Sequence, residues 1–166
     1  GLELVDTAAS EEISWVIALI DAIRSARAQM NVPAGAKVPL VQVAISPAGE
    51  AALASNMAQI QQMARIPEVT QVPEMPKGAI TITAPQATFG LPLADIIDVA
   101  AEKMRLEKSM GKLAKELGGL RGRLNNPKFA ISAPPEVLAE TRANLEAREE
   151  EEAKLATALA RLEEIG

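Results

Sequence analysis

The stretch LNNPKFAISAPPEV, from Leu124 to Val137, separates two long segments that are rich in Lys, Arg, Glu and Leu. It holds two asparagines, three prolines and one of only two phenylalanines in the chain. Asparagine and proline favour turns and helix ends, whereas a phenylalanine favours a buried contact. We therefore interpret residues 125–135 as a folded tip between two helices. One asparagine would cap exposed carbonyls or hold a turn, Phe129 would close the apolar contact, and Pro135 would stand in the first turn of the second helix.

On both sides of the tip, seam residues recur at alternating spacings of four and three. Before the tip they are Val99, Leu106, Met110, Leu113, Leu117, Leu120 and Leu124, with Lys103 in one further position; after it they are Leu138, Thr141, Leu145, Arg148, Glu152, Leu155, Leu159 and Leu162. This spacing is typical of the a and d positions of a coiled coil. Residues 93–166 are therefore predicted to form a long antiparallel two-helix hairpin in which Leu117 faces Leu145.

Charge is distributed unevenly along this predicted arm. Between Lys103 and Lys128 there are eight basic residues against two glutamates, a local sum of +6, and residues 132–166 hold four basic residues against nine glutamates, a sum of −5. One interpretation is that the two helices exchange salt bridges in solvent, which contribute little to stability. The other is that the first helix and the tip present a basic stripe to a phosphate backbone. Composition leaves both interpretations open.

The N-terminal part of the chain predicts a single helix. From Ser10 to Met30, one apolar stripe contains Ile13 and Ile17 and a second contains Trp15. Ser10 can cap the first turn of this helix. A helix that is apolar around most of its girth needs neighbours on several sides. We therefore interpret residues 1–32 as the last helix of a bundle.

Residues 33–92 predict a small α+β module. Strands are expected at 38–46 and 79–83, with shorter ones at 69–72 and 87–91, and a helix is expected from Pro47 to Arg65. No GxGxxG or Walker spacing occurs among the glycines. The overall expectation is an α+β chain: an N-terminal helix, this small module with short strands, and the long antiparallel coiled-coil hairpin.

Composition limits the chemistry that the chain can perform. The 166 residues are 48% hydrophobic, carry a net charge of −5 and include no cysteine and no histidine. Disulfides, Cys/His zinc sites and histidine-based catalysis are therefore excluded, and we expect no catalytic, cofactor-binding or metal-binding residue. No apolar run is long enough for a membrane span, and no signal peptide is visible. The chain opens at Gly1, and we interpret it as a cytoplasmic piece of a larger protein.

The tip and its surroundings resemble one family. Leu124, Asn126, Phe129, Ala133 and Pro134 match the Leu-x-Asn-x-x-Phe-x-x-x-Ala-Pro pattern of the C-terminal hairpin of valyl-tRNA synthetases. The segments 91–117 and 20–40 are similar to the entry into the family's first arm and to the end of its anticodon-binding domain, where an Arg-x-x-Arg motif is shared with related class I synthetases. In this chain Ala-Ile-Ser replaces a more basic stretch before Ala-Pro.

The resemblance implies a non-catalytic tRNA-binding fragment of a valine–tRNA ligase. In the family, the arm lies against the outer corner of tRNA, where the D and T loops meet, and supports ATP-dependent attachment of valine. The parent enzyme, expected to be monomeric, would bind ATP elsewhere, because no HIGH-type or KMSKS-type sequence occurs here. The candidate tRNA-binding residues are Arg121, Arg123, Lys128, Lys112, Lys115, Lys108 and Arg105. The alternative is a coiled-coil protein-interaction or structural hairpin module that binds no RNA.

Overall fold

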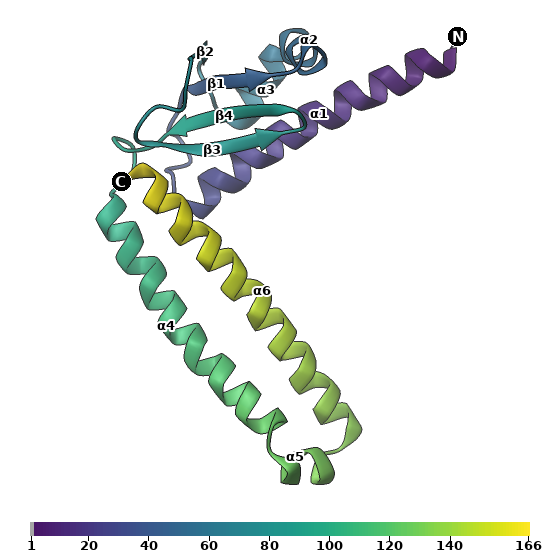
Figure 1. Cartoon of the computed structure of the whole chain (residues 1–166), viewed down its shortest axis with the longest axis vertical. Helices are drawn as coiled ribbons and strands as arrows, with labels where there is room; N and C mark the ends of the chain where they lie inside the picture. The colour runs from purple at the N-terminus through teal and green to yellow at the C-terminus, as the bar shows by residue number, and fades with distance from the viewer. Residues whose placement is uncertain (1) are drawn as a thin grey trace. The chain divides into compact units, whose positions relative to one another are not determined.

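The computed structural model of the chain describes the backbone of residues 2–166 and the side chains from Asp6 onward. Its elements are α1 Leu2–Gln29, β1 Leu40–Ile45, α2 Pro47–Ser55, α3 Met57–Ala64, β2 Val69–Gln71, β3 Ala79–Ala84, β4 Ala87–Pro92, α4 Val99–Leu124, α5 Pro127–Ser132 and α6 Pro135–Ile165 (Figure 1). Two compact units result: the residues up to Val99 together with Arg161–Gly166, and Ala100–Ala160. The first unit carries the sheet and the second is helical, which confirms the α+β class.

The sheet has four strands in the order β2-β1-β4-β3. β1 is parallel to its neighbour β2 and antiparallel to its other neighbour β4, and β3 is antiparallel to β4. The parallel pair requires a crossover, which α2 and α3 supply. All four strands were predicted from the sequence to within two residues at either end, because alternating apolar and polar residues such as Ile80, Thr81 and Ile82 are typical of half-buried strands.

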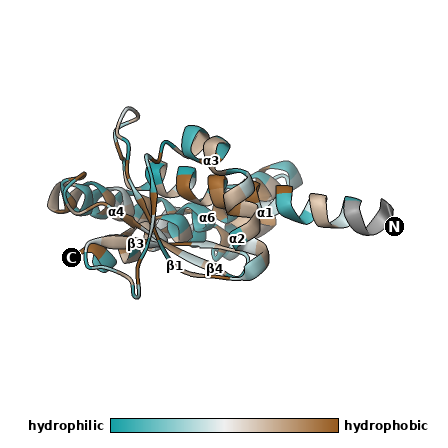
Figure 2. Cartoon of the chain, turned by 90° about the horizontal axis from the view of Figure 1, so that it is seen from above, coloured by the Kyte–Doolittle hydropathy of each residue, from teal (hydrophilic) through white to brown (hydrophobic). Residues whose placement is uncertain are grey.

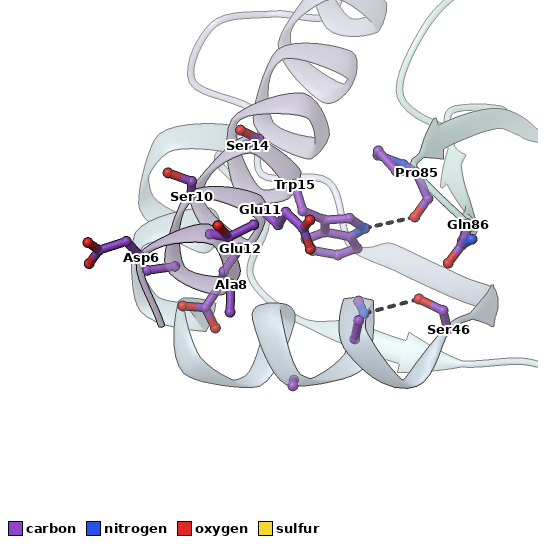
Figure 3. A pocket seen from close by; sticks show the side chains of 15 residues that line it. Asp6, Ala8, Ser10, Glu11, Glu12, Ser14, Trp15, Ser46, Pro85 and Gln86 are labelled. Carbon is purple, nitrogen blue, oxygen red and sulfur yellow. Dashed lines mark hydrogen bonds between the residues drawn. The ribbon is translucent and has the colours of Figure 1, made fainter. Parts of the chain in front are cut away.

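α1 packs against β3, α2 and α3. Trp15 is 6% exposed and Phe89 is fully buried, and their ring centroids lie 6.2 Å apart in an edge-to-face arrangement. The Trp15 indole N–H donates to the carbonyl oxygen of Pro85 at 3.0 Å (Figure 3). One apolar stripe of α1 is thus fixed on the small module. The other stripe, which contains Ile13 and Ile17, is exposed at these two residues, and Figure 2 shows apolar residues in brown on α1 beside α3.

Two helix predictions for this unit were wrong. Ser10 does not cap α1, because the helix already begins at Leu2 and runs through it. The helix expected from Pro47 to Arg65 is divided at Asn56, whose backbone φ of −124° and ψ of 18° is not helical. The Asn56 side-chain amide donates to the carbonyl oxygen of Ala52 at 2.8 Å. Asparagine competes for backbone groups in this way, so it favours helix ends over helix interiors.

In the second unit, α4 and α6 run side by side in opposite directions (Figure 1). The short helix α5 joins the end of α4 to the start of α6. Leu106, Leu113, Leu117 and Leu120 are buried, and the other apolar seam positions predicted along both helices are buried or half-buried. Lys103 departs from the predicted pattern: it is exposed, and Glu102 is half-buried instead. Glu102 lies four residues before Leu106 and Lys103 lies three before it. Both spacings place a residue on the same helix face as Leu106.

The tip is a short helix. Asn126 precedes α5, and its side-chain oxygen accepts a hydrogen bond from the backbone N–H of Lys128 at 3.0 Å. Of the two roles expected for an asparagine here, Asn126 holds the turn and does not cap carbonyls, because the groups without partners at a helix start are N–H donors. Pro135 is the first residue of α6, as predicted.

Within the described residues, no helix combines the length and the hydropathy that crossing a bilayer requires.

Candidate nucleic-acid interface

Five of the seven candidate cations share one face of α4. With about 100° of rotation per residue, their positions fall within an arc of roughly 80°, on the side of the helix turned away from the buried leucines. We call this set the basic face; it consists of Arg105, Lys108, Lys112, Lys115 and Arg123, and all five are exposed. A row of exposed cations along a straight helix has the form that contact with successive phosphates requires.

Arg121 lies on the opposite flank of α4. Its guanidinium lies 3.6 Å from the carboxylate of Glu149 on α6, and both side chains are about half exposed. Exposed ion pairs of this kind contribute little to stability, but they hold the charge against a counterion within the protein. Arg121 and Arg123 therefore differ in their surroundings, although they are only two residues apart.

Glutamates neutralise only the start of the basic face. The guanidinium of Arg105 lies 2.6 Å from the carboxylate of Glu102. Within the described part of the chain, no carboxylate lies within 4.0 Å of the charged nitrogens of Lys108, Lys112, Lys115 or Arg123. The middle and the tip-proximal end of the basic face thus carry uncompensated positive charge.

A polar hollow of about 400 Å³ continues the basic face toward α6. It is lined by Lys115, Glu116, Gly119, Leu120, Arg123, Asn144 and Arg148. Gly119 leaves this space open, because a Cβ built at Gly119 meets no atom within 4 Å. Across the hollow, the guanidinium of Arg148 lies 3.8 Å from the carboxylate of Glu116.

The tip holds Lys128 in a fixed backbone position. Its N–H donates to the Asn126 side chain, and its carbonyl oxygen accepts from the Ser132 hydroxyl at 2.5 Å. Lys128 is exposed, and so is Ile131, with 85% of its surface accessible. Phe129 is half-buried, as a residue that closes the end of an apolar seam would be.

Sequence reasoning missed the contribution of α6 to this surface. The spacing predicts Arg148 only as a seam residue, and no motif in the sequence marks Asn144. Arg148 is half-buried, yet it contacts Glu116 and also Glu151, whose carboxylate lies 3.4 Å away. A polar residue at an apolar seam position was the available signal, because such residues direct their charged ends to the edge of the seam.

A larger hollow lies elsewhere in the described residues and has a different character. It measures about 920 Å³ and lies between the first turns of α1, the start of α2 and the turn after β3 (Figure 3). Asp6, Glu11 and Glu12 are among its lining residues, and no cation is. Carboxylates repel phosphate, so this hollow does not suit a nucleic acid.

Comparison with known proteins identifies the helical part of the chain. Residues 98–163 match the family model described as the valyl tRNA synthetase tRNA binding arm. Over this segment the chain is thus similar to the tRNA-binding arms of aminoacyl-tRNA synthetases. Residues 98–163 belong to the valyl-tRNA synthetase tRNA-binding arm family, and over its length the chain corresponds to the C-terminal region of valyl-tRNA synthetases.

The relatives are valine–tRNA ligases of bacteria. The chain is 62% identical over 164 residues to the enzyme of Ruegeria pomeroyi, 56% over 165 residues to that of Cereibacter sphaeroides and 43% over 164 residues to that of Agrobacterium fabrum. Each alignment covers 99% of this chain but only 16% or 17% of the relative. The chain therefore spans about one sixth of the length of the curated relatives it matches.

Proposed function

We propose that this chain is the non-catalytic tRNA-binding region of a valine–tRNA ligase. Its arm would lie against the outer corner of the tRNA, where the D and T loops meet, and support ATP-dependent attachment of valine by the parent enzyme in the cytoplasm. The observation that carries the proposal is the basic face of α4, which lies within the segment matched to the tRNA-binding arm family. Cations that follow phosphates without contacting bases suit a folded RNA, which proteins recognise largely by shape.

We further propose that α4 and α6 form an antiparallel coiled coil. The burial of Leu113 and Leu117 on α4 and of Thr141 on α6 supports a shared seam. The ion pair between Arg148 and Glu116 supports the predicted register, because the same register places Arg148 near Leu113, three residues from Glu116.

For α1 we propose that it is the last helix of the anticodon-binding domain of the parent enzyme. The exposed stripe at Ile13 and Ile17 supports this assignment, because Ile13 is 59% and Ile17 is 52% exposed. Together with Met63 they line a hollow of about 420 Å³. Large apolar side chains gathered in this way are typical of a surface that packs against another part of a protein.

The deciding experiment uses the full-length parent enzyme. The double variant Arg123→Ala/Lys128→Ala removes two exposed cations near the tip, so tRNA affinity should fall about tenfold and its dependence on salt should become shallower by up to about two in log–log slope. Activation of valine with ATP, which requires no tRNA, should be unchanged.

The matched control is Lys77→Ala/Lys103→Ala, which removes the same net charge at exposed positions outside the basic face. It should keep the slope of the unchanged enzyme. Equal aminoacylation kinetics at low tRNA concentration for both double variants would contradict the proposal and favour a protein-interaction hairpin.

A further inference from the structure

We propose that Arg24, Arg27 and Arg65, which lie outside residues 98–163, form a second phosphate-binding site that holds one backbone phosphate of the bound tRNA. This inference rests on the proposed function for its ligand, but its residues lie in the unit that carries the sheet. We call the site the arginine pocket.

The arginine pocket forms where the ends of α1 and α3 meet the loop before β1. Arg24 and Arg27 lie in the last two turns of α1, and Arg65 follows α3 in a left-handed conformation, with φ 55° and ψ 46°. That conformation ends α3 and places Arg65 beside the loop. The three arginines line a hollow of about 380 Å³, completed by Ala28, Val32, Ala34, Gln62, Met63 and Ala64.

Arg27 is the buried member and has one unused donor. Its Nη2 donates to the carbonyl oxygens of Pro33 at 3.2 Å and Ala36 at 2.6 Å. Its Nη1 is buried and has no hydrogen-bond partner, and the residue as a whole is only 7% exposed. A buried donor without an acceptor is unfavourable, so an acceptor in the hollow would stabilise this arrangement.

The charge of the arginine pocket is also uncompensated. None of its lining residues is an aspartate or a glutamate, and within the described part of the chain no ion pair includes any of the three arginines. Burial, and then the nearby charge of Arg65, lower the pKa of Arg27. Two guanidinium groups that repel each other favour an anion between them.

A purely structural role explains only part of this cluster. Arg27 and Arg65 hold the loop, since Arg65 Nη1 donates to the carbonyl oxygen of Ala34. Arg24 makes no such contact among the described residues and is exposed, yet it lines the same hollow. Guanidinium groups bind phosphate oxygens through paired N–H donors, and an exposed arginine beside a buried one gives an external phosphate access.

The first test measures anion binding without RNA. The 166-residue chain, labelled with ¹⁵N, is titrated with inorganic phosphate against chloride at constant ionic strength, and the Arg27 side-chain resonance is followed by NMR. We expect a saturable shift that is at least fivefold weaker in Arg24→Gln. Lys37→Gln, which removes an exposed charge outside the pocket, should titrate like the unchanged chain. Absence of a saturable shift in the unchanged chain would overturn the proposal.

The second test identifies the source of the phosphate in the full-length parent enzyme. Arg24→Gln should weaken tRNA binding about three- to tenfold and reduce the salt slope by about one, whereas Lys37→Gln should change neither. Arg65→Asn serves as a second variant, because asparagine tolerates the left-handed conformation. Arg24 is exposed and its side chain makes no hydrogen bond or ion pair among the described residues, so Arg24→Gln should retain the fold, whereas Arg65→Asn also removes the hydrogen bond to Ala34.

The outcomes separate this proposal from the one on the arm. If Arg24→Gln lowers the salt slope while Arg123→Ala/Lys128→Ala does not, the arginine pocket stands and the basic face fails. If phosphate binds but Arg24→Gln leaves tRNA binding unchanged, the pocket does not hold tRNA and the proposal is wrong. If Arg24→Gln lowers the thermal stability of the parent enzyme without changing the salt slope of tRNA binding, the pocket binds a carboxylate of the parent chain. That result would also overturn the proposal.

Discussion

The carboxylate of Glu164, in the last turn of α6, accepts two hydrogen bonds from Thr81 on strand β3, one from its backbone N–H at 2.9 Å and one from its hydroxyl at 3.1 Å. β3 is an edge strand, so some of its backbone groups lack a neighbouring strand. Glu164 supplies an acceptor for one of them. Close by in the chain, Arg161 Nη1 donates to Gln29 Oε1 at 2.7 Å.

This contact gives the first prediction. Glu164→Ala should lower the free energy of unfolding of the sheet unit by about 0.5–1.5 kcal/mol, because one edge N–H loses its charged acceptor. Glu163→Ala is the control: Glu163 is the exposed neighbour of Glu164 and has the same charge. Urea unfolding of the two variants provides the measurement, and equal midpoints would show that the contact contributes nothing.

The second prediction concerns the packing of α4. Leu117 is 1% exposed, so Leu117→Ala should cost about 2–4 kcal/mol in the unfolding of the arm. Leu145, predicted to face it, is half-buried, and its replacement by alanine should cost less than that of Leu117. Lys115→Ala should be close to neutral. Circular dichroism during thermal unfolding would rank the three, and a neutral Leu117→Ala would refute the seam.

The third prediction separates helix stability from RNA binding. Gly119 and Gly111 are both exposed on α4 with no atom within 4 Å of an added Cβ, so either change to alanine should stabilise the helix by up to about 1 kcal/mol. Only Gly119 lines the polar hollow beside Arg123. Gly119→Ala should therefore weaken tRNA binding by the parent enzyme a few-fold.

Gly111→Ala should leave that binding unchanged. The comparison needs only two measurements for each variant, the melting temperature and the dissociation constant for tRNA. If both alanines raise the melting temperature and neither changes affinity, RNA does not enter the hollow.

The fourth prediction concerns the tip. Asn126→Ala removes the acceptor for the Lys128 N–H and should cost about 1 kcal/mol, which would be lost from α5 and its immediate surroundings. Amide hydrogen exchange of residues 127–132 should accelerate about fivefold. Asn125→Ala, one residue earlier and also exposed, should leave the exchange rates as they are. Faster exchange in both variants would point to a general loosening of the turn.

Much of the fold could be predicted because its signals are local. The alternation of Ile80 and Ile82 with threonines indicated β3, and the heptad spacing of the leucines indicated which residues of α4 would be buried. The division of one predicted helix at Asn56 was missed, since a polar residue between two helical patterns is tolerated in some helices and ends others. Propensity alone does not decide between these outcomes.

The candidate interface was predictable only up to the helix itself. Sequence spacing separates Arg121 from Arg123 by about 200° of rotation, but it does not reveal that Glu149 lies opposite Arg121. That contact depends on how the two helices are aligned and on the conformations of long side chains. The arginine pocket could not be predicted from the sequence. Its third member, Arg65, is placed beside the loop by its own left-handed conformation at the end of α3.

Residues Arg161–Gly166 belong to the unit that carries the sheet, although they continue α6. The chain leaves the sheet unit after Val99 and returns to it at Arg161, so residues 100–160 form a closed excursion with both ends anchored in the same body. Under the proposed coiled-coil pairing, such an excursion can be lengthened or shortened by adding or removing matching heptads in its two halves, while both of its ends stay in the sheet unit. The number of heptads would then set the length of the arm itself.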